Sequence, residues 1–112
     1  MAGGFTSAGL FNNLAYALIS SARREEAVGW LDRAIAADRN LADAYYQRAT
    51  VSAALAAQQQ QDIGPTAIND IEKAIALSPS NYRIRLSAAR IYAWHAKRTR
   101  ARADLQKALD HL

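Results

Sequence analysis

The chain has 112 residues, 51% of them hydrophobic, a length that suits one domain with a single core. With 21% charged residues, 5 Gly and 2 Pro it is neither collagen-like nor disordered, and no uncharged apolar run reaches the roughly 18 residues that span a bilayer. The absence of Cys excludes disulfides and thiol chemistry. Residues 1–5 lack the basic and apolar blocks of a signal peptide. The compartment is left open, with the cytoplasm slightly favoured over the periplasm.

Alanine, the strongest helix former, accounts for 26 residues and predicts an all-α fold. Asn40 is expected to cap the third helix, Pro65 to lie in the first turn of the fourth and Pro79 to follow its end. The six expected helices cover residues 7–22, 25–37, 42–59, 65–77, 81–96 and 99–111.

Two series of residues recur along the chain. A small-large-small stripe on one helical face is repeated after 40 and then 34 residues, at Ala27-Leu31-Ala34, Ala67-Ile71-Ala74 and Ala101-Leu105-Ala108. A second series is repeated after 34 and then 40 residues, at Leu14-Ala15-Leu18, Arg48-Ala49-Ser52 and Ala88-Ala89-Tyr92. The period is therefore 34, with six extra residues between Ser52 and Ala67. These spacings predict one domain, 1–112, of three units at about 8–41, 42–81 and 82–112.

Two helices per period of 34, with these small and large positions, resemble the tetratricopeptide repeat family over nearly the whole chain. The first unit is the closest to the family pattern, through Phe11, Leu14, Ala15, Leu18, Ala27, Leu31 and Ala34. The later units depart from it, with Arg48 and Ala88 in place of Leu and Arg85 in place of an apolar residue. The resemblance implies a right-handed α-α superhelix of three helix-turn-helix repeats. An ordinary helical bundle is the alternative.

In that family the first helices of successive units line a concave groove, so the chain is expected to be a non-catalytic module that binds a peptide or a partner helix. Only Arg83 keeps the charge of the clamp by which one subfamily holds chaperone tails, so a chaperone tail is not expected. An acidic or otherwise anionic partner stays a candidate. Packing and solvated surface are the alternative roles for the groove positions. These positions are Asn12, Tyr16, Tyr46, Gln47, Thr50, Arg83, Leu86, Arg90 and Trp94.

The chain offers little for catalysis. His95 and His111 are isolated, with no metal-ligand partner at i, i+4, and are expected on the surface. Glu25 and Glu26 suit the first turn of a helix, where acidic groups favour the helix dipole. We therefore expect no enzyme activity, no metal and no cofactor.

Charge is segregated along the chain, because residues 82–112 hold eight basic and two acidic groups while the preceding residues hold six and eight. The densest basic cluster comprises Lys97, Arg98, Arg100 and Arg102, at the expected turn and the start of the last expected helix. It is interpreted as a solvated turn. Docking on nucleic acid or an anionic membrane is the less favoured alternative.

The last expected helix carries apolar residues for which no covering helix is predicted, namely Leu105, Leu109 and Leu112. The chain is then either a segment of a longer scaffold or signalling protein or self-associates through this face. The Ala- and Arg-rich composition is associated with bacterial proteins.

Overall fold

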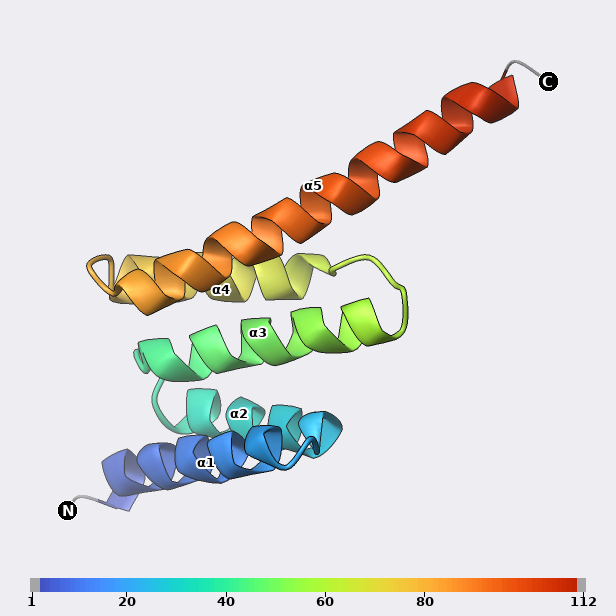
Figure 1. The fold of residues 1–112 in the computed structure, drawn as a ribbon. Coiled ribbons are helices and arrows are strands. Elements are labelled where there is room, and N and C mark those ends of the chain that lie inside the picture. The colour runs from blue at the N-terminus through green and yellow to red at the C-terminus, as the bar shows by residue number, and fades with distance from the viewer. Residues whose placement is uncertain (1–2, 111–112) are drawn as a thin grey trace.

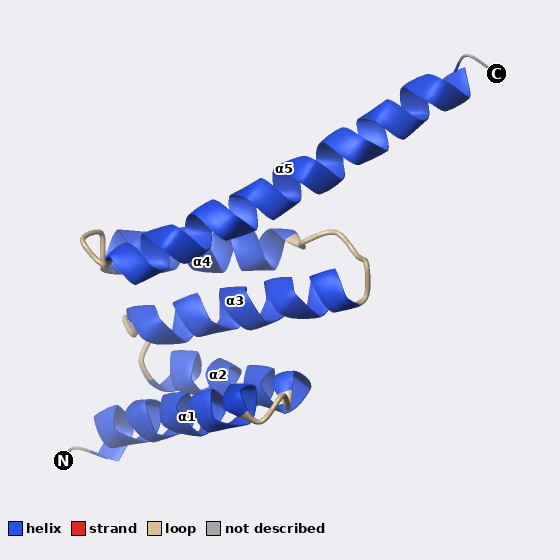
Figure 2. Ribbon diagram, viewed as in Figure 1, coloured by secondary structure: helices blue, strands red, loops and turns tan. Residues whose placement is uncertain are grey.

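The computed structural model describes residues 3–110, which form five helices and no strand (Figure 2). The all-α class is thereby confirmed. The first four helices lie close to their expected ranges, but the last two are replaced by one. The helices are α1 Gly3–Ser20, α2 Arg24–Ala37, α3 Ala42–Gln58, α4 Pro65–Leu77 and α5 Tyr82–Asp110.

The helices form two antiparallel hairpins followed by one long helix (Figure 1). α1 pairs with α2, and α3 pairs with α4. The first half of α5 packs on α4, and its second half projects beyond both hairpins. The first helix of each unit also contacts the first helix of the next, α1 with α3 and α3 with α5. These three helices therefore share one side of the molecule.

Local signals explain several helix ends. Pro65 begins α4, where a missing amide hydrogen costs nothing. The side-chain oxygen of Asn81 accepts hydrogen bonds from the backbone N–H groups of Arg83 at 3.0 Å and Ile84 at 3.4 Å, and so caps α5. The expected cap at Asn40 is wrong, because Leu41 occupies that position and makes no side-chain cap. Asn40 instead donates its backbone N–H to Asp38 Oδ1 at 3.0 Å, which tightens the turn before α3.

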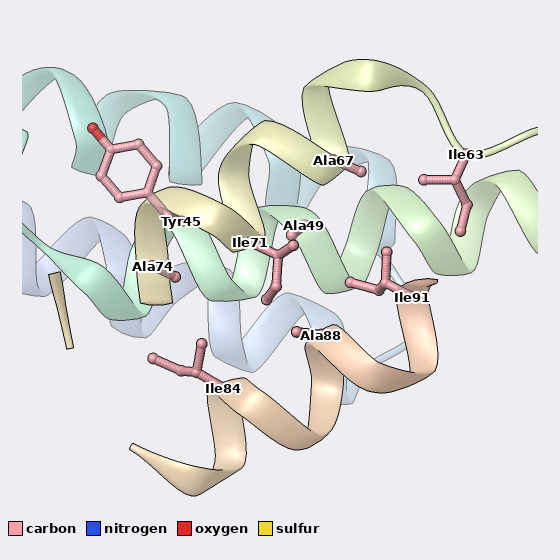
Figure 3. Close-up of a cluster of buried hydrophobic side chains, with 9 residues drawn as sticks. All are labelled: Tyr45, Ala49, Ile63, Ala67, Ile71, Ala74, Ile84, Ala88 and Ile91. Atoms are coloured by element: carbon pink, nitrogen blue, oxygen red, sulfur yellow. The ribbon is translucent and has the colours of Figure 1, made fainter. Parts of the chain in front are cut away.

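The core consists of two clusters, one for each hairpin. The stripe of α2 is fully buried against α1 and α3, together with Ala15, Ala44 and Val51. The stripe of α4 is buried equally well in a second cluster that also receives Ile84, Ala88 and Ile91 of α5 (Figure 3). The repeated small-large-small positions are therefore the packing positions of the first two units.

The third unit does not form the expected pair of helices, so the prediction of three helix-turn-helix repeats is wrong at this point. α5 continues through residues 97 and 98, where a turn was expected. Residues 94–101 contain no Gly, Pro, Asn or Ser to end a helix. A new helix starting at residue 99 would place basic residues at its positive N-terminal end, where the helix dipole repels them. In a continuous helix these residues lie in the interior, so the repulsion is absent. The stripe Ala101-Leu105-Ala108 is exposed as a result.

Candidate functional site

Two adjoining hollows lie along the side shared by α1, α3 and α5, and we call them together the groove. Both are lined by Thr50, which joins them. The polar hollow, of about 330 Å³, is lined by Tyr16, Ile19, Asp43, Tyr46, Gln47, Thr50, Val51 and Arg83. The apolar hollow, of about 210 Å³, is lined by Thr50, Ala53, Ala54, Ile63, Ser87, Arg90, Ile91 and Trp94.

The structure brings most of the predicted groove residues together. Seven of the nine line the hollows, namely Tyr16, Tyr46, Gln47, Thr50, Arg83, Arg90 and Trp94. Asn12 is buried and supports Gln47 through a hydrogen bond. Leu86 lines neither hollow and is half exposed. The sequence analysis missed Asp43 and Ala54, which lie one turn from Gln47 and Thr50 and could have been found from that spacing. It also missed Ile63, whose place in the insertion carries no periodic signal.

Asp43 and Gln47, which line the polar hollow, form a hydrogen-bonded triad with the buried Asn12. Asn12 Nδ2 donates to Asp43 Oδ2 at 2.7 Å. Gln47 Nε2 donates to Asn12 Oδ1 at 2.8 Å and to Asp43 Oδ2 at 3.0 Å. Gln47 is 5% exposed, and among the described residues its Oε1 atom has no hydrogen-bond partner. The triad therefore holds Gln47 rigidly while leaving one acceptor unused.

A cation and aromatic rings border the same hollow. The Arg83 guanidinium lies over the Tyr46 ring, with its carbon 6.0 Å from the ring centroid. Tyr16 is 60% exposed on the opposite helix, α1. Within the described residues Arg83 forms no ion pair, so its hydrogen-bond donors can bind an anionic group beside the Tyr46 ring.

The apolar hollow has different chemistry. Its walls are Ala53, Ala54, Ile63 and Ile91, with the Trp94 ring at one end. The Arg98 guanidinium lies 6.0 Å from the Trp94 centroid. Trp94 Nε1 is buried without a hydrogen-bond partner in the described part of the chain. The hollow suits one apolar side chain, with Arg90 exposed beside it.

The predicted basic cluster is divided between two roles. Arg98 donates from Nη2 to the carbonyl oxygen of Gln60 at 2.7 Å, and its Nε lies 3.3 Å from Asp62 Oδ1. Arg102 forms an ion pair with the same Asp62 carboxylate. These two arginines tie α5 to the loop between α3 and α4. Lys97 and Arg100 are exposed, on a continuous helix instead of the expected turn.

The remaining candidates are placed as follows. His95 is exposed on α5, and Leu105 and Leu109 are 60% and 51% exposed. His111 and Leu112 lie outside the described residues. Within residues 3–110, no three His, Asp or Glu side chains gather as metal ligands. No helix in that range has the length and apolar character needed to cross a bilayer.

Comparison with protein-family models, with curated proteins and with solved structures finds no match to this chain. The resemblance to tetratricopeptide repeats therefore rests on the repeated residues alone.

Proposed function

We propose that this chain is a tetratricopeptide-like interaction module that binds a peptide or a partner helix in the groove. In this proposal the successive units follow a right-handed superhelix, with α1, α3 and α5 on the concave side. Two observations support this arrangement. Each of the two helical hairpins buries a small-large-small stripe, and α1 contacts α3 as α3 contacts α5.

The observation that carries the proposal is the composition of the groove. Tyr and Trp offer large apolar area at a small cost in side-chain entropy, and Arg offers forked hydrogen bonds. Five such residues line two adjoining hollows, namely Tyr16, Tyr46, Trp94, Arg83 and Arg90. This is the type of surface that contributes most of the binding energy in protein interfaces.

The two hollows also indicate the chemistry of the partner. The apolar hollow accepts a side chain of the size of Leu or Phe, while Arg83 and Arg90 favour carboxylates close to it. We therefore expect an acidic segment that presents an apolar anchor residue. Such a peptide would span both hollows past Thr50.

The test is affinity capture from a lysate of the source cells with three immobilised chains, namely wild type, Tyr46→Ala with Arg90→Ala, and Tyr82→Ala with Arg33→Ala. The third chain is a matched control, because it removes one Tyr and one Arg at positions outside both hollows. Proteins retained by wild type and the control, but not by the groove variant, support the proposal. Equal retention by all three chains contradicts it.

Peptides from a retained protein then measure the affinity directly. In a Trp30→Phe background the only tryptophan is Trp94, which lines the apolar hollow and reports binding by its fluorescence. We expect Arg90→Ala to weaken binding of an acidic peptide by about tenfold, the loss of one charge-assisted hydrogen bond. The same change should have little effect on a peptide whose acidic residues are replaced by amides.

Docking on nucleic acid or an anionic membrane is the alternative function, and the exposed Lys97 and Arg100 are the observation that favours it. It is less well supported, because Arg98 and Arg102 are already paired with Asp62. Binding to duplex DNA or anionic vesicles that falls steeply with salt would support it, and no binding at low salt would dismiss it.

A further inference from the structure

Two faces of α5 lack the neighbours that their counterparts have in the first unit. In both repeated series, a residue of unit 3 lies 74 positions after its counterpart in unit 1. The open face of α5, Tyr82, Arg85, Ala89 and Tyr92, thus corresponds to Ala8, Phe11, Ala15 and Leu18. Ala8 and Ala15 are at most 1% exposed, whereas Tyr82 is 75% and Tyr92 38% exposed, with the Tyr92 hydroxyl hydrogen-bonded to Glu72 of α4.

The end of α5 carries the matching stripe. Ala101, Leu105 and Ala108 correspond to Ala27, Leu31 and Ala34, all of which are fully buried against α1 and α3. In α5 the three residues are exposed, with Leu105 at 60%. One molecule therefore presents both halves of a packing arrangement that its first hairpin has already formed.

The sequence places opposite charges at one pair of corresponding positions. In the first hairpin the rings of Phe11 and Trp30 lie 5.6 Å apart. The corresponding positions in unit 3 hold Arg85 and Asp104, which are opposite charges. Arg85 is exposed and donates its Nε hydrogen to the carbonyl oxygen of Pro79 at 2.5 Å.

The geometry of a straight helix restricts what can cover these faces. Ala89 and Ala101 are twelve residues apart, so at 3.6 residues per turn they point about 120° away from each other. If two straight copies of α5 lie side by side, each turns a single face toward the other along its whole length. Such a pair cannot cover both the open face and the stripe at the end of α5. Within one chain the faces meet only if the helix breaks between them. The first hairpin breaks at Ala22, which has a φ of 61° and corresponds to Ala96.

We propose that residues 99–110 are a docking segment with two positions, extended as in this structure or folded back onto the open face of α5 in the same chain. The contacts of Arg98 and Arg102 with Asp62 hold the extended position. Docking removes Arg98 from the ring of Trp94, which lines the apolar hollow, and so links the segment to the end of the groove. This inference goes beyond the proposed function and does not depend on it.

The experiment measures one distance by pulsed dipolar electron paramagnetic resonance. The chain has no Cys, so Leu86→Cys with Lys107→Cys provides two unique sites for spin labels. In the extended helix these positions are 21 residues apart, or about 32 Å at 1.5 Å per residue. In the docked position they lie on neighbouring helices, and the separation falls to roughly 10–15 Å between backbones.

Two substitutions should shift the population toward the short distance. Asp62→Asn weakens the contacts that hold the extended position, and Ala96→Gly accepts the left-handed conformation of a turn. We expect a minor short distance in the wild-type background and a major one when both changes are combined. Glu25→Gln, a similar loss of charge on α2, is the control and should leave the distribution unchanged. A long distance alone in every variant overturns the proposal.

Two further measurements identify what the segment docks on. Arg85→Asp and Asp104→Arg should each reduce the short distance in the combined variant, and the two together should restore it. Chains carrying one label each, mixed in equal amounts, should give no short distance at any concentration. A short distance in that mixture would mean that a second copy covers the open face, and this would also overturn the proposal.

Discussion

Arg48 occupies a position of α3 at which an apolar residue would suit the repeat, and its surroundings explain the charge. Its Nε and Nη2 atoms donate to the two carboxylate oxygens of Asp70 at 2.7 and 2.8 Å, and Nη1 donates to Asp32 at 3.0 Å. The hydrogen bond with Asp70 is the largest cause that raises the pKa of Arg48 above its usual value. The ion pair thus joins α3 to α4.

We expect Asp70→Ala to lower the free energy of unfolding by about 2 kcal/mol, because it leaves the partly buried Arg48 charge with only Asp32. Urea denaturation followed by circular dichroism measures the change. Asp32→Ala is the control and should cost less than about 1 kcal/mol, since the Asp32 side chain is 57% exposed. Equal losses in the two variants would contradict this account.

Tyr92 makes the free energy of unfolding depend on pH in the alkaline range. Loss of solvent around its hydroxyl raises its pKa, and so does the 2.9 Å hydrogen bond that the hydroxyl donates to Glu72. Because the pKa is higher in the folded chain, the contribution to stability is present below about pH 10 and is lost as the pH rises through the raised value. Between pH 9 and pH 11, unfolding by urea should show a smaller loss of stability in Tyr92→Phe than in wild type. A loss of stability over this pH range that is equal in Tyr92→Phe and in wild type would reject the assignment.

At the scale of the elements, the connections between helices decide the architecture more than the helices do. The two hairpins turn through residues in the left-handed region, Ala22 with a φ of 61° and Gln60 with a φ of 55°. Neither is Gly, so no glycine in the sequence marked the left-handed residue of either turn. The first turn forms because α2 can bury its stripe and because Glu25 and Glu26 favour the start of a helix. α5 has neither a breaker nor acidic residues at the corresponding place.

Ala22→Gly should raise the free energy of unfolding by about 1 kcal/mol, because Gly adopts the left-handed conformation without the strain of a side chain. Chemical denaturation at neutral pH measures it. The matched variant Ala17→Gly lies on an exposed face within α1 and should lower stability by about 1 kcal/mol. A loss of stability in both variants would show that the turn at Ala22 is not strained.

At the scale of the whole molecule, the core is a series of contacts between neighbouring units. The cluster around Leu31 belongs to α1, α2 and α3, and the cluster around Ile71 belongs to α3, α4 and α5. α3 contributes to both and therefore couples them. In such an arrangement stability is approximately a sum over units and their interfaces.

Ile71→Ala should cost about 3 kcal/mol, the usual loss for a large core residue, and its effect should be greatest in the second unit. Hydrogen exchange should show faster opening of α4 and α5, with α1 and α2 changed less. Leu86→Ala, at a half-exposed position of α5, is the control and should change exchange little. Uniform acceleration over all five helices would instead indicate one indivisible core.

The sequence by itself determined the all-α class, the first four helices and the positions of the buried stripes, because these depend on helix propensity and on apolar residues repeated along the same chain segment. Seven of the nine residues that it assigned to a groove line the two hollows. Only the tertiary structure decided the continuity of α5. The missing turn signal favours one long helix, whereas burial of the stripe Ala101-Leu105-Ala108 would favour two. The tertiary structure alone decided the pairing of Arg98 and Arg102 with Asp62 and the place of Ile63 in the groove. Those contacts join the insertion to a helix more than 30 residues away, and no spacing within the sequence encodes them.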